Sequence, residues 1–233
     1  MAPDGDAPKR ALRPVDAASL ILLDRSGGAP RALVGRRSSK HVFMPSTYVF
    51  PGGRVDASDG SIGIARGYRP EDERRLLDGM RARATHRRAR ALGVAALREM
   101  AEETSIVLGE PDRGTAGQVP PHFAARSVAP ALAPLRYVAR ATTPPGRTRR
   151  FDTRFFACFT HQFDGNTVDP RDSDELADLR WMELTDETLD MPRITRVILG
   201  ELTARLRADP DLTADQPVPH HHMRHRNFVR VEE

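Results

Sequence analysis

Apolar residues gather into short runs near the start of the chain, separated by small turn-forming residues. Residues 18–24 (ASLILLD) and residues 32–36 each have the length and apolar content of a buried strand. Gly27 and Gly28 stand between them, which predicts a hairpin. Residues 43–54 form a third apolar segment that runs into a Pro-Gly-Gly turn. The pattern therefore predicts several strands in the first quarter of the chain.

Helical spacing of apolar residues appears in the middle and near the end of the chain. Pro70 is followed by three acidic residues, which is typical of a helix start. Residues 85–104, rich in Ala, Leu, Arg and Glu, predict a long helix. Residues 185–190 and 194–208 predict two more, the second with an apolar stripe at helical spacing.

The second half of the chain adds three more predicted strands. Residues 135–141 and 154–161 flank a Pro-Pro-Gly turn, and residues 179–183 form a short strand. Residues 109–134 contain several Pro and Gly and predict a loop with little regular structure. Strands mixed with two main helices indicate an α/β or α+β domain.

The length of 233 residues fits one domain with tails. We expect a disordered tail over 1–13, a domain over 14–208 and a polar His/Pro-rich tail over 209–233. A single cysteine, Cys158, excludes a disulfide framework and is expected in the core. No apolar run is long enough for a membrane span and no signal peptide is visible, so we expect a soluble, cytoplasmic protein.

Charge adds one restriction and one oddity. The formal net charge of +4 is too small to argue for nucleic-acid binding. The chain holds 34 Arg but only 2 Lys. Arg suits phosphate binding because its planar fork grips an anion at two points, but composition bias explains the ratio equally well. The same two explanations apply to the nine Arg within residues 60–90.

The segment Arg98 to Glu103 contains the most informative chemistry. Glu99, Glu102 and Glu103 share one helix face, where like charges repel. Arg98 can pair with Glu102, four residues on. A divalent cation would compensate the charge better, and hard oxygen ligands suit Mg²⁺ or Mn²⁺. A solvated acidic face is the alternative.

This segment, taken together with the Pro-Gly-Gly turn, resembles the Nudix hydrolase box. Gly53 fits the first glycine of the box, and its second half is matched in register by Arg98, Glu99, Met100, Glu102, Glu103 and Ile106. Two residues depart from it: Ser105 stands where the family has glycine, and Asp59 where it has the first glutamate. Between Asp59 and Arg98 lie 38 residues where the family has seven, so about 31 are inserted, over about 60–90.

A split box of this kind is similar to the peroxisomal coenzyme A diphosphatase branch of the superfamily. Further matching stretches are residues 43–45, 143–146, 150–156 and 178–181. The resemblance covers roughly residues 15–205 and implies an α/β fold, the Nudix-type α/β/α sandwich with a mixed sheet. The inserted segment is expected to be helical.

The resemblance also implies roles for individual residues. Metal ions, Mg²⁺ or Mn²⁺, would be held by Gly53 (through its carbonyl), Glu99, Glu102 and Glu103, and Arg98 would orient the glutamates. The catalytic base would be a helix glutamate or a loop acid, for which Glu175 is the candidate. The substrate phosphates would be met by Arg150, Phe151 and Arg154.

The implied activity is metal-dependent cleavage of a diphosphate bond in a nucleotide-type small molecule, with coenzyme A or an acyl-CoA as the leading substrate. ADP-ribose, a dinucleotide or a nucleoside triphosphate is the alternative substrate, and a non-catalytic nucleotide-binding module is the second alternative. No membrane or nucleic-acid partner is expected, and a homodimer remains open. The histidines of the last tail (His220, His221, His222 and His225) suggest a metal site, but a flexible His run is more often adventitious.

Overall fold

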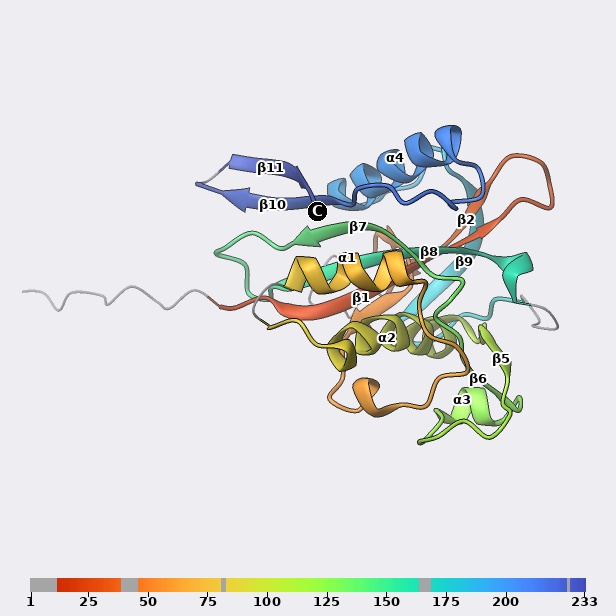
Figure 1. Ribbon diagram of the computed structural model, residues 1–233. Helices are drawn as coiled ribbons and strands as arrows, with labels where there is room; N and C mark the ends of the chain where they lie inside the picture. The colour runs from red at the N-terminus through yellow and green to blue at the C-terminus, as the bar shows by residue number, and fades with distance from the viewer. Residues whose placement is uncertain (1–11, 39–45, 81–82, 164–168, 226) are drawn as a thin grey trace, which may run out of the picture.

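A mixed β-sheet runs through the centre of the fold, with helices on both faces (Figure 1). The computed structural model describes residues 12–38, 46–80, 83–163, 169–225 and 227–233. The strands are β1 (Val15–Asp24), β2 (Arg31–Arg37), β3 (Tyr48–Val49), β4 (Gly52–Arg54), β5 (Gly109–Pro111), β6 (Val128–Pro130), β7 (Arg136–Thr142), β8 (Phe151–Phe159), β9 (Leu176–Glu183), β10 (Pro219–Arg224) and β11 (Asn227–Glu232). The helices are α1 (Pro70–Met80), α2 (His86–Thr104), α3 (Pro121–Ala124) and α4 (Arg193–Ala208), with 3-10 turns η1 (Asp59–Ser61) and η3 (Thr160–Gln162).

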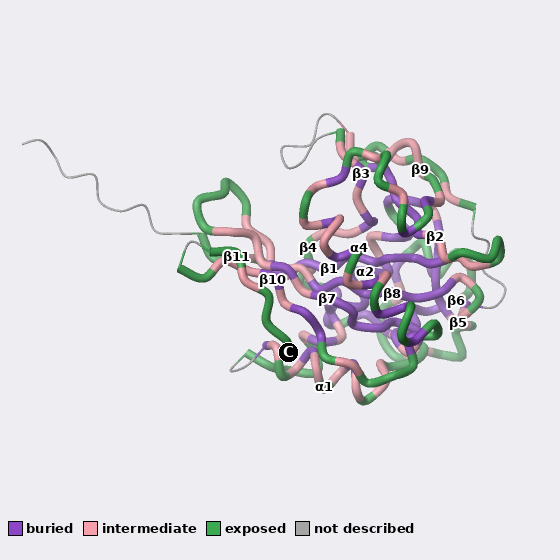
Figure 2. Tube along the Cα trace, turned by 90° about the horizontal axis from the view of Figure 1, so that it is seen from above, coloured by how far each residue is buried: buried purple, intermediate pink, exposed green. Residues whose placement is uncertain are grey.

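The large sheet has the strand order β11-β10-β7-β8-β1-β2-β3, with β4 also paired to β1 and β9 to β2. Strand β1 lies at its centre, parallel to β8 and antiparallel to β2 and β4. Its side chains alternate between the faces, as a strand buried on both sides requires. Ala18, Leu20 and Leu22 pack on the side of α1 and α2, while Ile21 and Leu23 pack on the side of α4. Figure 2 shows the buried strands at the centre of the fold. The α/β/α sandwich is confirmed.

Most of the predicted elements are confirmed. The β1–β2 hairpin forms across Gly27-Gly28, the helix at Pro70 begins where it is expected, and β7, β8, β9 and α4 match their predicted segments to within three residues. Helix α2 begins directly after Thr85, whose side chain accepts a hydrogen bond from the Arg88 N–H. Residues 1–11 of the predicted N-terminal tail and residues 43–45 of the third apolar segment lie outside the described residues.

Three predictions are wrong. Residues 185–190 form a turn because the Asp186 carboxylate accepts hydrogen bonds from both the N–H and the hydroxyl of Thr188. Residues 109–134 contain the β5–β6 hairpin and the short helix α3. The tail after residue 208 folds into β10 and β11, and β10 joins the sheet beside β7.

The segment over about 60–90, which the sequence predicts to be an insertion, belongs to the helical layer. Leu76 and Met80 of α1 are buried in the same core as α2. Asp72 is also buried, and its carboxylate accepts a hydrogen bond of 2.9 Å from the Tyr137 N–H on β7. Helix α1 is thus held to the sheet by both apolar and polar contacts. No helix among the described residues is long and apolar enough to cross a membrane.

Candidate active site

Helix α2 presents the predicted carboxylates near its C-terminal end. The helix ends at Ser105, which adopts a left-handed conformation with φ of 62° and donates its N–H to the Ala101 carbonyl. Serine therefore takes the backbone geometry that glycine adopts more easily at this position. The departure from the family pattern at Ser105 leaves the end of the helix intact.

Arg98 is the centre of the polar network on this helix. Its guanidinium donates to both Asp59 carboxylate oxygens at 3.0 and 3.1 Å, and to Glu99 and Glu102 at 2.9 Å each. It also donates to the Arg54 carbonyl at 3.1 Å. Asp59 is fully buried, so the residue at the position of the first box glutamate forms a buried ion pair with Arg98. The fold thus brings Asp59 and Arg98 into contact, although 38 residues separate them in the sequence.

The Pro-Gly-Gly turn lies directly against the helix. The Gly52 N–H donates a hydrogen bond of 2.8 Å to the Glu103 carboxylate. A Cβ built at Gly53 would overlap the Glu99 carboxylate, so only glycine allows this close approach. The backbone of β4 and two of the three predicted glutamates therefore meet at one point.

Crowding raises the pKa values of these glutamates. Burial raises the pKa of Glu103 to about 8, and the charge of Glu99 adds to the shift. The pKa of Glu99 is raised in the same sense, mainly by burial and in part by Glu102 and Glu175, although Arg98 opposes the shift. Glu175 acts on both groups, although it comes from the loop before β9. The structure thus brings the predicted loop acid into the neighbourhood of the helix carboxylates.

Comparison with known proteins gives a structural match only. No protein-family model and no curated protein matches the chain. The fold is similar to the crystal structure of a Nudix hydrolase from Alicyclobacillus acidocaldarius, with a TM-score of 0.65 and 27% identity over 87% of this chain and 96% of that one. The chain has the fold of the Nudix hydrolases.

More distant Nudix structures also align with the chain. A MutT Nudix hydrolase from Burkholderia pseudomallei has a TM-score of 0.46 and 16% identity, over 82% of this chain and 99% of that one. The Nudix domain of Shewanella oneidensis NrtR, in complex with ADP ribose, has a TM-score of 0.48 and 13% identity, over 87% and 94%. Likenesses this distant carry no information about the substrate of this chain.

The donor set of this candidate site suits a divalent cation. Buried carboxylates with raised pKa values are an unfavourable arrangement, which a hard cation would relieve. No three acidic, His or Cys side chains of the described residues converge as a ready-made ligand cluster. Glu99 and Glu102 both contact Arg98 instead. Binding a metal would therefore exchange part of the Arg98 contacts for metal–oxygen contacts.

Arg37 was missed by the sequence reasoning. It ends β2, pairs with Leu176 across β9, and its neighbour Ser38 donates its N–H to the Glu175 carbonyl at 3.0 Å. Its positive charge lowers the pKa of Glu103 against the effect of burial. Strand alternation was the available signal, since Arg37 follows Leu33 and Gly35 on the α2 side of the sheet. The positive charge of Arg37 thus acts on the Glu103 carboxylate.

The predicted phosphate-binding residues lie elsewhere. Arg154 is only 1% exposed and bonds Asp16 at 3.1 Å and Asp152 at 3.0 Å, within a network that includes Arg88 from the first turn of α2. Arg150 bonds the carbonyls of Leu12 and Thr143. The prediction that Arg154 meets a substrate is therefore wrong in this structure, because its charge is used to stabilise the buried start of β8.

Phe151 is half-buried at the first position of β8 and pairs with Val15 on β1. The Val15 N–H donates a hydrogen bond of 3.0 Å to the backbone carbonyl of Arg150, the residue before Phe151. The role of Phe151 in substrate binding remains a prediction. Arg150, Phe151 and Arg154 all lie near the N-terminal ends of β1 and β8. Among the described residues, no hydrogen bond or ion pair joins them to the glutamates of α2.

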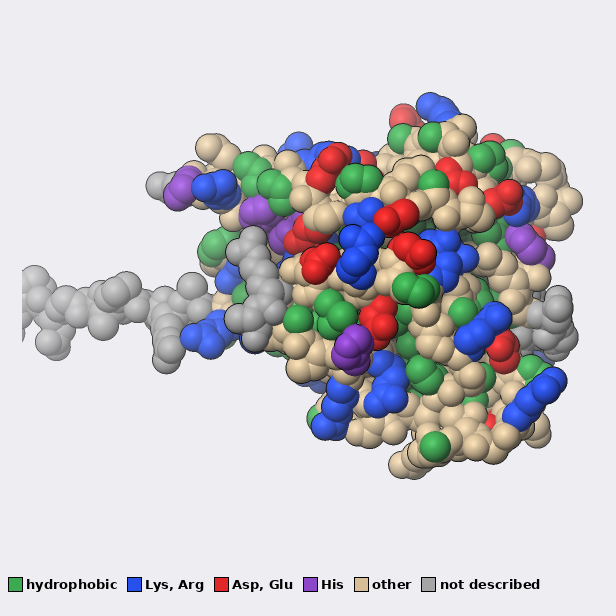
Figure 3. Space-filling view, viewed as in Figure 1, with side chains coloured by type: hydrophobic (Ala, Val, Ile, Leu, Met, Phe, Trp, Pro, Cys, Tyr) green, Lys and Arg blue, Asp and Glu red, His purple; other side chains and the backbone are tan. Residues whose placement is uncertain are grey.

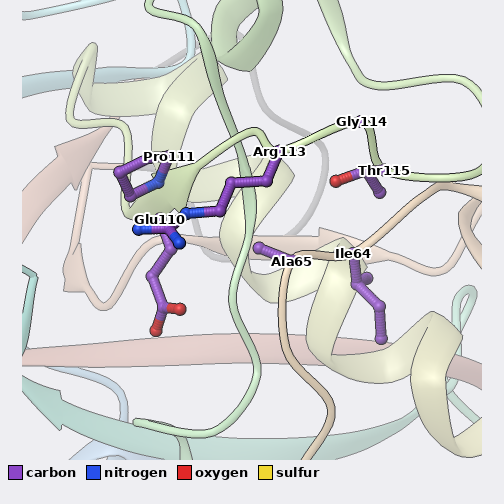
Figure 4. A pocket seen from close by; sticks show the side chains of 7 residues that line it. All are labelled: Ile64, Ala65, Glu110, Pro111, Arg113, Gly114 and Thr115. Atoms are coloured by element: carbon purple, nitrogen blue, oxygen red, sulfur yellow. The ribbon is translucent and has the colours of Figure 1, made fainter.

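One cavity of the described residues has a lining that includes none of these carboxylates. It measures about 340 Å³ and lies between the segment at Ile64 and the loop after β5 (Figure 4). It is lined by Ile64, Ala65, Glu110, Pro111, Arg113, Gly114 and Thr115, none of which is a predicted site residue. We assign the site by the chemistry of the glutamates, because a diphosphate binds through charge and needs no deep apolar cavity.

Proposed function

We propose that the protein hydrolyses the diphosphate bond of a nucleoside diphosphate linked to another moiety, using Mg²⁺ or Mn²⁺. One observation carries the proposal: Arg98, braced by buried Asp59, holds Glu99 and Glu102 beside the Gly53 backbone and Glu103. A pure binding module has no need of such a self-repelling group. When bound, the divalent ion would neutralise the phosphate oxygens and lower the pKa of a coordinated water.

The side chains of the chain itself have separate tasks in this proposal. Glu99, Glu102 and Glu103, with the Gly53 carbonyl, would hold the ion, and Arg98 would keep the glutamates in place. Glu175 is proposed to take the proton from the attacking water, because it lies in the charge field of Glu99 and Glu103 and is exposed.

Coenzyme A or an acyl-CoA is the proposed substrate, on the strength of the split box and its neighbouring motifs. The surface seen in Figure 3 has acidic and basic side chains interspersed, with no continuous basic face. Such a surface favours a small anionic substrate over a nucleic acid.

The test is hydrolysis of coenzyme A with Mg²⁺ or Mn²⁺, followed by chromatography for 4′-phosphopantetheine and adenosine 3′,5′-bisphosphate. ADP-ribose, dinucleotides and nucleoside triphosphates complete the panel. Glu102→Gln should lose activity on every substrate that the wild type cleaves, and Glu187→Gln, at an exposed position outside the site, should keep it. Turnover of another compound in the panel would replace coenzyme A, and tight nucleotide binding without any turnover would favour the binding module.

A further inference from the structure

The β10–β11 hairpin forms an open edge of the sheet. Strand β11 pairs with β10 over six residue pairs, and β10 reaches β7 only at His220 and His221. The hairpin projects beyond the body of the protein (Figure 1). Within the described residues no strand lies on the outer side of β11. Such an edge can be extended by another strand.

The register shows which backbone groups of β11 point outward. Val218 and Glu233 exchange two hydrogen bonds, of 2.9 and 3.0 Å. Hydrogen-bonded and non-bonded pairs alternate in an antiparallel ladder, so Val231 also faces β10. The N–H and C=O groups of Phe228, Arg230 and Glu232 therefore point away from the hairpin. They can accept a partner strand.

The side chains of β11 are unusually apolar for an edge. The exposed large hydrophobic residues among those described are Leu12, Val15, Phe228 and Val231, and two of these four lie on β11. Charged residues separate them: Arg230 contacts Glu201 on α4 at 2.6 Å, and also Glu232 at 3.1 Å. An edge without proline, bulge or lysine is poorly guarded against pairing.

The order of charges along β11 identifies the partner. In antiparallel pairing about a two-fold axis at Val231, Arg230 lies opposite Glu232 of the second copy, and this ion pair occurs twice. An axis at Arg230 would place Arg230 opposite itself. An axis at Val229 would place Arg230 opposite Phe228 and would pair no two charged residues of β11. Among the residues of β11, the first register is the one that matches opposite charges.

We propose that β11 pairs antiparallel with β11 of a second copy of this chain, centred on Val231. Arg230 and Glu232 of the two copies form hydrogen-bonded pairs, which gives four new backbone hydrogen bonds. The two Val231 side chains face each other at the axis. The sheet then runs continuously through a symmetric dimer.

The register predicts which engineered cysteine can cross-link. The two copies of Val231 form a non-hydrogen-bonded pair, with Cα atoms about 4.5 Å apart, which suits a disulfide. Val229 lies four residues from its own symmetry copy along the strand, about 14 Å, which is too far. The natural Cys158 is fully buried and does not interfere. Under mild oxidation Val231→Cys should give a covalent dimer and Val229→Cys should not. A monomeric Val231→Cys protein, or a linked Val229→Cys protein, overturns the proposal.

A charge reversal tests the same pairing without cysteine. Glu232→Arg replaces both ion pairs by repulsive pairs and should weaken the dimer about ten-fold or more in sedimentation equilibrium. Glu187→Arg makes the same charge change at an exposed site away from the hairpin and should leave the dimer unchanged. Urea unfolding of each variant checks that it is folded. A wild type that stays monomeric at millimolar concentration, or a dimer equally strong in Glu232→Arg, refutes the proposal.

Discussion

Replacing Asp59 by asparagine tests the internal support of the glutamate site. The Asp59 carboxylate is fully buried, accepts two hydrogen bonds from Arg98 at 3.0 and 3.1 Å, and accepts a third from the Asp56 N–H at 2.8 Å. An amide offers one oxygen, and its NH₂ group would face the donors of Arg98.

The magnitude follows from the contacts that remain. Breaking a buried ion pair costs about 3–5 kcal/mol. Arg98 keeps Glu99, Glu102 and the Arg54 carbonyl, so we expect a loss below this range, about 2–3 kcal/mol. With a urea slope of about 2–3 kcal/mol per molar, the unfolding midpoint should fall by about 1 M.

Asp56→Asn is the matched control. Its carboxylate is 56% exposed and lies 3.9 Å from Arg98, so its loss should change stability by less than about 0.5 kcal/mol. Both variants are measured by urea unfolding at pH 7 without metal, and Mg²⁺ affinity is measured by calorimetry. We expect about ten-fold weaker Mg²⁺ binding in Asp59→Asn, because Arg98 then binds Glu99 and Glu102 more closely. Equal midpoints for the two variants would refute this account of Arg98.

Three further predictions concern the same site. Burial raises the pKa of Glu103 from 4.5 to about 8, so the metal-free protein should lose stability as the pH rises through that interval. In thermal unfolding, Glu103→Gln should flatten this dependence of stability on pH. An unchanged dependence in the variant would contradict the assigned burial of Glu103. Gly53→Ala should weaken Mg²⁺ binding in calorimetry because the added methyl displaces Glu99, and equal affinity would show that Glu99 moves freely. In steady-state kinetics, Arg37→Ala should raise KM for the cleaved diphosphate about ten-fold, and Arg37→Lys should raise it less. An unchanged KM in Arg37→Ala would show that Arg37 is not part of the site.

The sequence predicted the parts of the site that depend on local spacing. The glutamates of α2 and the end of β4 could be found because helix and turn signals are local. Asp59 was noted only as a departure from the family glutamate, because its contact with Arg98 joins residues far apart in the sequence. Arg154 was misassigned because its partners, Asp16 and Asp152, pair with it only through the parallel contact of β1 with β8. The pairing of β1 with β8 cannot be predicted from the spacing of residues in the sequence.

The C-terminal segment was misread for a related reason. His220 contacts Glu233 and His221 contacts Glu201, so the two successive side chains have different partners, as expected in a strand. A run of identical residues conceals this alternation in the sequence. A histidine run gives no hydrophobic alternation to detect. Its strand character depends on β7, which offers an edge to β10.

The parallel pairing of β1 with β8 also sets the order in which the protein can fold during its synthesis. Nine register pairs, from Val15 with Phe151 to Leu23 with Phe159, close the middle of the sheet. The ribosome has made all of α2, and with it the complete glutamate motif, before β8 emerges. Until then the apolar run of β1 has β2, β4 and the helices α1 and α2 beside it, but it lacks its parallel neighbour. A nascent chain that stops short of residue 151 carries the whole motif without the strand that completes the centre of the sheet.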